Sequence, residues 1–440
     1  MPRVTPFKAL LALLGLSCAI GVGSQAAPPQ QAALPTTGTL FDHAMLISGD
    51  GPRGFTAQDS AFVVSDGKIL SINPPGHYGL PMGWRSVDLK GQFVIPGLIS
   101  AHAHVSDVNG LRPRAYTDEN TRRQLGVFAR YGITSVWSLG GEAAPAFAIR
   151  DAQSTATLDR ARLFLAGQIV TATTPEEARQ AVARVAATKP DVIKIRVDDN
   201  LGTAQKMPPA VYRAVIDEAH RLGLRVAAHI FYLQDAKDLL RAGVDMIAHS
   251  VRDLDLDAET IGLLKARNVP YCPTLTREVS TYVYESTPAF FTDPFFAHEA
   301  DPEVVAQLQQ PARQQAMRAS ASAQRYKAAL VVAMRNLKKA ADAGVLVAMG
   351  TDSGAFPERF QGYFEHLEMQ MMVDAGLTPA QVIRASTTDA ARAMNRTDIG
   401  AIAVGRWADF VVLEKNPLLD IRNTRSIASV WVAGQRVPAR

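Results

Sequence analysis

Two histidines separated by a single residue, His102 and His104, end the apolar run FVIPGLISAHAHV at 93–105. Side chains alternate along a β-strand, so residues two apart point to the same face, and both imidazole rings can reach one ion. A His-x-His pair alone is weak evidence, because two histidines this close often occur without a metal. The pair indicates a metal site only if further ligands converge on it.

Further candidate ligands lie at the ends of three other apolar runs. His229 lies in RVAAHI, His249 in MIAHS and Asp352 in GTDSG. Each of them alone would more often be a structural residue. Imidazole together with carboxylate is the ligand set that zinc and similar divalent ions favour, so the group as a whole predicts a metal centre.

Lys194 lies in the middle of the apolar run VIKIRVDD at 192–199. A buried lysine is costly unless it is paired or chemically altered, and metal ions would repel its ammonium form. A buried neutral amine is a nucleophile, and its reaction with carbon dioxide would give an anionic carbamate able to bridge two metals. An ion pair with Asp198 or Asp199 is the alternative, and we favour the carbamate.

These residues need a scaffold that gathers the ends of strands. Apolar runs alternate with helical patterns from about 93 to 390, as in parallel strands joined by helices. We therefore predict the α/β class with a (β/α)8 TIM-like barrel at 93–397, whose catalytic groups lie at the carboxyl ends of the strands. An open doubly wound sheet is disfavoured, because no glycine-rich phosphate motif follows the first strand. The eight strand candidates are 93–105, 134–141, 162–170, 192–199, 225–230, 246–250, 270–275 and 345–354.

Two segments outside the barrel, 38–92 and 398–440, alternate apolar and polar positions around turns and predict one small β-sandwich domain built from both. Residues 276–320 interrupt the barrel pattern and are rich in aromatic residues. This insertion either overhangs the barrel mouth or packs as a peripheral helical hairpin that buries its own rings. Its aromatic residues include Tyr282, Tyr284, Phe290, Phe291, Phe295 and Phe296.

The first residues resemble an export signal, with Arg3 and Lys8 before an apolar run and small residues before a cut after 26. We expect a signal peptide at 1–26 and a secreted or periplasmic protein, with a lipoprotein anchored at Cys18 as the alternative. No later stretch is long and apolar enough for stable membrane insertion. Loss of Cys18 would leave Cys272 alone, which we expect to be a core thiol.

The remaining charge is nearly balanced, with 44 basic against 42 acidic residues once Arg3 and Lys8 are removed. No basic patch indicates a nucleic-acid partner. The expected partner is a small-molecule substrate, and a homo-oligomer is compatible with the sequence.

An ordered set of motifs covers nearly the whole mature chain: PGLISAHAHV, YGITSVWSLGG, IKI, AAHI, IAHS, MGTDSG and ADFVVLEKNPLLDI. This set resembles the amidohydrolase superfamily, and within it the binuclear members related to imidazolonepropionase and the prolidase-type dipeptidases. The resemblance implies that His102, His104 and Asp352 hold the more buried of two divalent ions, with zinc favoured. It implies that His229 and His249 hold the more exposed ion, and that carboxylated Lys194 and a hydroxide bridge the two.

The implied reaction is hydrolysis of an amide or peptide-like C–N bond, of a dipeptide or an N-acyl amino acid. A water shared by two ions would have its pKa lowered from 15.7 to about 7, and Asp352 would carry its proton to the leaving nitrogen. A mononuclear deaminase or cyclic-amide hydrolase is the alternative, as is hydrolysis of lactones or phosphotriesters. A scaffold protein without chemistry is disfavoured, because the ligand set has no gap.

Two side chains could select the substrate. Arg196 lies two residues beyond Lys194, hence on the same face of the strand, and could hold a carboxylate unless it pairs with Asp198. Tyr232, just after the fifth candidate strand, is either a polar contact for the substrate or part of the loop packing.

The sequence departs from common relatives at Ser100, where an acid often follows PGLI, and at Trp137-Ser138, where an Arg-Asp pair is common. Neither change removes a ligand, but both could alter the surroundings of the metals.

Overall fold

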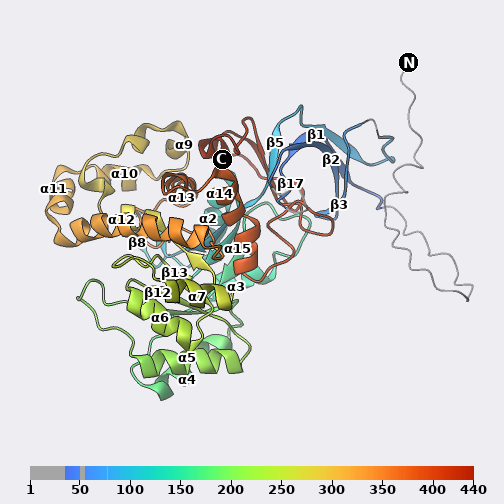
Figure 1. Ribbon diagram of the computed structural model, residues 1–440. Coiled ribbons are helices and arrows are strands. Elements are labelled where there is room, and N and C mark those ends of the chain that lie inside the picture. The colour runs from blue at the N-terminus through green and yellow to red at the C-terminus, as the bar shows by residue number, and fades with distance from the viewer. Residues whose placement is uncertain (1–34, 50–54, 77) are drawn as a thin grey trace, which may run out of the picture.

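The computed structural model describes residues 35–49, 55–76 and 78–440, so the predicted signal peptide at 1–26, with Cys18, lies outside the described residues. Among the described helices, none has the length and apolar character needed to cross a membrane. Figure 1 shows a large unit of helices and strands with a smaller sheet at one side.

The smaller sheet, here called the terminal sheet, combines strands from both ends of the chain. Its order is β17-β16-β15-β5-β1-β2-β3, and β4 pairs with β1. The N- and C-terminal parts meet where β15 runs antiparallel to β5, with Phe410 opposite Pro96. A sheet domain built from both terminal segments is therefore confirmed, and its strands form one continuous sheet. The strands are β1 (Thr39–Leu46), β2 (Gln58–Ser65), β3 (Lys68–Asn73), β4 (Arg85–Asp88), β5 (Phe93–Pro96), β15 (Phe410–Leu413), β16 (Ile427–Val432) and β17 (Gln435–Arg436).

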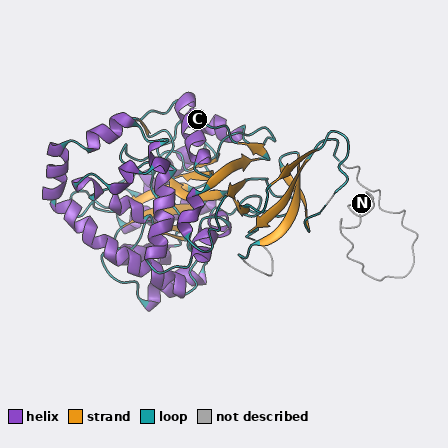
Figure 2. Ribbon diagram, turned by 90° about the horizontal axis from the view of Figure 1, so that it is seen from above, coloured by secondary structure: helices purple, strands orange, loops and turns teal. Residues whose placement is uncertain are grey.

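The larger unit has parallel strands in its interior, with helices around them (Figure 2). They form two sheets, of order β10-β9-β6 and β11-β12-β13-β14. β-branched and other apolar residues fill these strands because helices cover them on the outside. The strands are β6 (Leu98–Ala103), β9 (Ile133–Ser138), β10 (Arg162–Leu165), β11 (Ile193–Val197), β12 (Val226–Ile230), β13 (Met246–Ala248) and β14 (Tyr271–Cys272). A two-stranded hairpin, β7 (Val108–Asn109) and β8 (Arg112–Pro113), follows β6.

Isolated bridges connect the two sheets in the order of a (β/α)8 barrel. Val170 pairs with Ile195 on one side, while on the other side Tyr271 pairs with Val347 and Ala103 with Ser353. The segment 345–354, predicted as the eighth strand, thus lies between β14 and β6 through single bridges. No continuous ladder closes the ring among the described residues. The left-handed backbone of Asp352, with φ of 63°, interrupts regular pairing there.

Helices follow the strands and begin at residues that cap them. Thr174 and Glu177 form a capping box at the start of α4, with Pro175 at the first turn, and Asp257 caps α7. The helices around the barrel are α2 (Asp118–Arg130), α3 (Ala144–Asp151), α4 (Pro175–Ala186), α5 (Pro209–Arg221), α6 (Leu233–Ala242), α7 (Ala258–Ala266), α12 (Ala321–Asp342), α13 (Tyr363–Asp374), α14 (Pro379–Ala385) and α15 (Thr388–Ala393).

The insertion at 276–320 consists of short helices, seen with α9 to α11 beside α12 in Figure 1. Its rings pack against one another and against the barrel unit: Phe291 stacks on Phe296 with ring centroids 5.3 Å apart, and Phe296 lies 4.8 Å from Phe360. This packing favours the alternative in which the rings are buried structurally. The elements are α8 (Leu275–Val279), η1 (Val283–Glu285), η2 (Ala289–Thr292), α9 (Pro294–Ala297), α10 (Pro302–Leu308) and α11 (Pro311–Ala319).

A buried ion pair joins the terminal sheet to the barrel. Arg162 at the start of β10 bonds Asp409, with Nε 2.7 Å from Oδ2, and its guanidinium stacks on Trp407 at 4.1 Å. The short helix η3 (Ile421–Arg425) adds a second contact, through Thr424 and His366 of α13. The two units therefore share a tightly bonded boundary.

Candidate metal centre

The end of β6 supplies the first two imidazoles. His102 is fully buried and lies in β6, and His104 follows the strand, its N–H bonded to the carbonyl of Ser353 at 2.7 Å. His104 Nε2 lies 3.0 Å from Asp352 Oδ1, and His102 Nε2 lies 3.3 Å from the same oxygen. Both rings therefore face one carboxylate, as their alternation along the strand predicts.

The second sheet supplies a lysine and two more imidazoles. Lys194 of β11 is buried, with Nζ 3.3 Å from His102 Nε2. His249, directly after β13, lies 4.5 Å from His102 and 4.1 Å from His229 of β12 between ring centroids. The carboxyl ends of β6, β11, β12 and β13 thus meet at one place.

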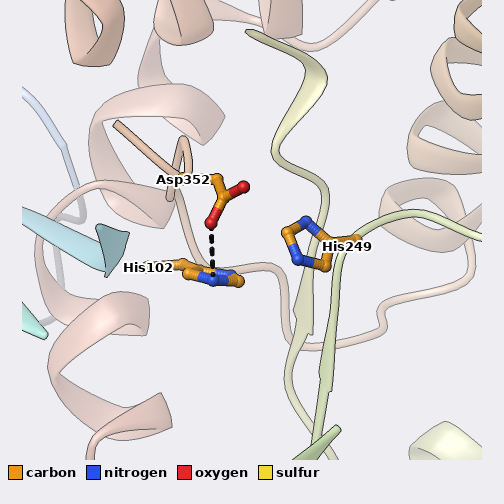
Figure 3. A group of neighbouring side chains, drawn as sticks. All are labelled: His102, His249 and Asp352. Carbon is orange, nitrogen blue, oxygen red and sulfur yellow. Dashed lines mark ion pairs between the residues drawn. The ribbon is translucent and has the colours of Figure 1, made fainter. Parts of the chain in front are cut away.

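The structure brings all six predicted ligands together, and we call them the strand-end cluster: His102, His104, Lys194, His229, His249 and Asp352. Within it, His102, His249 and Asp352 offer ligand atoms that all lie within 4.8 Å of one another. Figure 3 shows the His102 ring below the carboxylate of Asp352, with the His249 ring beside them. Three donors this close can belong to one metal centre.

Most imidazoles of the cluster are held neutral. Burial, reinforced by the charge of Lys194, lowers the pKa of His102 to about 3. Burial likewise lowers the pKa of His229 and of His249 well below the ordinary value. A neutral imidazole is the form that binds a metal, so these rings are prepared for that role.

The acid and the lysine complete the donor set. Burial alone would raise the pKa of Asp352, but Arg359, His102 and His104 hold it well below its usual range. Asp352 is therefore a carboxylate. Burial lowers the pKa of Lys194 to about 8, which leaves part of the amine uncharged at neutral pH.

Neighbouring side chains orient the imidazoles. His104 Nδ1 lies 2.9 Å from Asp107 Oδ2, His249 Nδ1 lies 2.7 Å from Thr274 Oγ1, and His229 Nε2 lies 2.7 Å from Asp198 Oδ2. A partner on one ring nitrogen fixes the ring and leaves the other nitrogen for a ligand. In His104, burial opposes protonation, yet Asp107 and Asp352 raise its pKa to about 10. These two carboxylates make His104 the most basic imidazole of the cluster.

The donor set fits divalent metal ions on its chemistry. Neutral imidazoles and a carboxylate converge at ligand spacing, and His102 Nδ1 is buried without a hydrogen-bond partner among the described residues. Sites of this composition suit zinc and similar ions. The assignment of each residue to an ion stays a prediction.

A buried glutamate holds the segment that carries Asp352. Glu365 of α13 accepts hydrogen bonds from the hydroxyls of Ser100, Thr351 and Ser353, at 3.0, 2.7 and 2.7 Å. Ser100, one of the departures from common relatives, thus helps to fix the backbone beside the cluster. Ser138, the other, accepts the N–H of Val105 at 2.9 Å next to His104.

The two predicted substrate residues lie apart from these contacts. The Arg196 side chain is 42% exposed and pairs with Asn200 and with Asp198. The Tyr232 hydroxyl donates to Asp199 at 2.9 Å. Their binding of substrate stays a prediction, and the contacts with Asp198 and Asp199 are the structural alternatives. Because Asp198 and Asp199 have these other partners, no ion pair between either and Lys194 is formed.

Arg359 is the neighbour that the sequence did not indicate. It lies in the loop after 345–354, is buried, and bonds Asp352 Oδ2 through Nη1 and Ser280 Oγ through Nε at 3.0 Å. An arginine in a loop has no periodic pattern. Asp107 was missed as well, although its position three residues after His104 was a visible signal.

Comparison with known proteins gives one family. The profile described as the Amidohydrolase family matches residues 93–437. The ochratoxinase of Aspergillus niger is 27% identical over 283 residues, 61% of this chain and 51% of that protein. The imidazolonepropionase of Deinococcus deserti is 37% identical over 100 residues, 22% of this chain and 25% of that protein. The chain thus spans about half, or less, of the length of these curated relatives.

Solved structures share the fold. A Xaa-Pro dipeptidase with bound methionine in its active site superposes with a TM-score of 0.73 at 22% identity, covering 91% of this chain and 99% of that one. The crystal structure of A. niger ochratoxinase gives a TM-score of 0.68 at 20% identity, covering 92% and 96%. At these identities, the likeness shows the fold.

Proposed function

Because the chain belongs to the amidohydrolase family, we propose that it is a metal-dependent hydrolase of an amide or peptide-like C–N bond. The proposed substrate is a dipeptide or an N-acyl amino acid. The observation that carries this proposal is the strand-end cluster, in which four imidazoles, a carboxylate and a lysine meet at the carboxyl ends of the strands.

Two ions would be held by this cluster. His102, His104 and Asp352 would hold one and His229 and His249 the other, with Lys194 between them as a carbamate. The contact of Lys194 with His102, 3.3 Å from Nζ to Nε2, supports this arrangement, as does the absence of any ion pair of Lys194 with a carboxylate in the described residues. Burial lowers the pKa of Lys194 to about 8, so part of the amine is uncharged and able to react with carbon dioxide.

The carbamate forms without a further reactant beyond carbon dioxide. The Lys194 nitrogen adds to the carbon of CO₂, one proton leaves the nitrogen, and the product carries one negative charge. That charge would offset part of the positive charge of the ions, which a lysine ammonium would increase. Mutual repulsion between the ammonium and the ions therefore favours the modified side chain.

When bound, the ions would lower the pKa of a shared water to about 7 and polarise the substrate carbonyl. Asp352 would accept a proton from the attacking water and donate it to the leaving nitrogen. Thr274 and Asp107 would keep His249 and His104 in position during this transfer. The buried surroundings of the cluster would strengthen each of these charge interactions.

The named relatives support an amide substrate at the level of reaction class. The structural neighbours include a Xaa-Pro dipeptidase, a molinate hydrolase and a phenylurea hydrolase. These activities belong to those proteins. Export to the periplasm or beyond is proposed from the sequence alone.

The first experiment is metal analysis of purified protein combined with a screen of N-acyl amino acids, dipeptides, lactones and organophosphates. We expect about two divalent ions per chain and turnover of an amide. One ion in a fully active preparation would favour the mononuclear alternative. Turnover confined to lactones or phosphotriesters would contradict the amide assignment.

The second experiment replaces Lys194 with alanine. We expect loss of at least one of the two ions and of activity, and partial rescue by short carboxylic acids that occupy the place of the carbamate. Arg335→Gln, an exposed change on α12, is the matched control. Full activity of K194A would contradict the carbamate, and rescue by primary amines instead of acids would do the same.

A further inference from the structure

Three buried arginines lie in the loops that follow the last strands of the barrel, and we call them the mouth arginines. Arg252 follows β13, Arg277 lies in α8 after β14, and Arg359 follows 345–354. Their exposed fractions are 1%, 7% and 7%. Buried arginines are uncommon unless each has a partner, so their counter-charges decide what this region can bind.

Negative charge is scarce around these three side chains. Glu278 serves two of them, with Oε1 3.1 Å from both Arg252 Nε and Arg277 Nη1. Arg359 pairs with Asp352, which is itself a proposed metal ligand. Asp198 is occupied by His229 and Arg196. Three guanidinium groups thus share two carboxylates, one of which would also face a metal.

The mouth arginines also include a hydrogen-bond donor that has no partner among the described residues. Arg277 Nε is buried without a hydrogen-bond partner in the described part of the chain. Arg359 uses Nη1 for Asp352 and Nε for Ser280. An unsatisfied donor on a buried charge is costly, and a bound anion would remove that cost.

Ser280 connects the Arg359 side chain to the backbone of Arg277, and Arg359 lies directly against the cluster. Ser280 Oγ accepts a hydrogen bond from Arg359 Nε and donates one to the carbonyl of Arg277, at 3.0 and 2.7 Å. The plane of Arg277 is fixed over the Tyr326 ring at 4.6 Å. Arg359 touches Asp352 directly, so an anion bound here would lie beside the reacting centre.

We propose that Arg277 and Arg359 form the site for the free carboxylate of the substrate. This inference rests on the proposed function and narrows its substrate class to peptides and N-acyl amino acids with an unblocked carboxyl group. Guanidinium groups match a carboxylate with two parallel hydrogen bonds. The sequence suggested Arg196 as the residue that binds the substrate carboxylate. We assign this binding to Arg277 and Arg359 instead, because Arg196 is half-exposed and already paired with Asp198.

The test measures binding to zinc-loaded protein by calorimetry. The probes are the N-acetyl derivatives of leucine, phenylalanine, arginine and proline, each compared with its C-terminal carboxamide. We expect at least one acid to bind about 10- to 150-fold more tightly than its amide, the range of a hydrogen bond to a charged group. In Arg277→Gln this preference should fall to about threefold or less.

Matched variants separate this role from folding. Arg277→Lys keeps the charge and should retain part of the preference, while Arg335→Gln, an exposed change on α12, should leave it unchanged. Zinc content and thermal midpoint confirm that each variant is folded. Where Arg277→Gln does not fold, Arg359→Lys tests the same site, and it should weaken binding of the acid more than of the amide.

Two groups of outcomes would overturn the inference. In the first group, the unaltered protein binds acids and amides equally, or it binds none of these probes. A preference that survives Arg277→Gln is the other, and its loss in Arg196→Gln would assign the carboxylate to Arg196. Failure of the proposed function is a separate result, because it appears as absence of amide turnover while binding of the acids persists.

Discussion

The terminal sheet and the strand-end cluster are both buried, yet opposite kinds of side chain fill them. Phe41, Phe62 and Phe410 pack inside the terminal sheet with ring centroids 4.9 to 5.1 Å apart. The cluster instead buries imidazoles, a carboxylate, a lysine and neighbouring arginines. Burying apolar rings stabilises a fold, whereas burying ionisable groups costs free energy. The comparison indicates that the packing of the terminal sheet stabilises the protein, and that the strand-end cluster serves to bind a ligand.

The largest expected effect is in the cluster, for Asp352→Asn. The carboxamide cannot carry a proton between water and the leaving nitrogen, so kcat should fall by about 10²- to 10⁴-fold. Its oxygen still accepts a hydrogen bond from Arg359, so the thermal midpoint should move less than in the sheet variant below. Steady-state kinetics and a melting curve measure both. A kcat within a few-fold of the unaltered protein would show that Asp352 moves no proton.

The second expected effect is in the terminal sheet, for Phe410→Ala. Removing a fully buried ring that touches Phe41 and Phe62 should lower the free energy of unfolding by about 3–5 kcal/mol. At temperatures where the variant stays folded, kcat and KM should be unchanged. Denaturant unfolding followed by kinetics checks this. A large change in kcat without loss of stability would contradict the view that the terminal sheet only stabilises the fold.

The smallest expected effect concerns His366, a buried histidine that is satisfied by the protein. Its ring nitrogens lie 3.0 Å from Thr424 Oγ1 and 2.8 Å from the carbonyl of Tyr131, and burial lowers its pKa to about 3. It stays neutral in the folded protein, while the unfolded chain takes up a proton below about pH 6.5. Stability should therefore fall as the pH falls from 6.5 toward 3.

The variant His366→Gln isolates this contribution. Its stability deficit relative to the unaltered protein should shrink by about 2 kcal/mol between pH 7 and pH 5. Urea unfolding at both pH values measures the difference. Parallel curves for the two proteins would mean that His366 has the same pKa in the folded and unfolded states, so that burial does not keep it neutral.

The metal ligands were predictable because the alternation of residues along a strand and the order of the strands can be inferred from the sequence. Alternation along β6 puts His102 and His104 on one face, and the barrel order brings the ends of β11, β12 and β13 to the same place. The terminal sheet was predictable from its alternating segments. Both features depend on regular β-strand backbone, in which the spacing of residues determines the face to which each side chain points.

The surroundings of the ligands were less predictable, because irregular backbone places them. Asp352 and His249 have φ of 63° and 82°, so no periodicity describes where their side chains point. Arg359, Thr274 and Asp107 reach the cluster from loops. The segment 345–354 was expected to be a full strand, and it pairs only through single bridges next to the left-handed Asp352. Long-range contacts determine the conformation of such segments, and these contacts cannot be inferred from the spacing of residues along the chain.

The pairing of β5 with β15 has a consequence for biosynthesis. Met45 and Leu46 of β1 lie beside β5, whose other edge is filled only by residues 410–413 near the far end of the chain. During translation the early strands therefore leave the ribosome long before their neighbour exists. Such non-local pairing is slow to form, and an open strand edge attracts other chains. A chaperone that covers this edge of the nascent N-terminal strands would protect the chain until β15 is made.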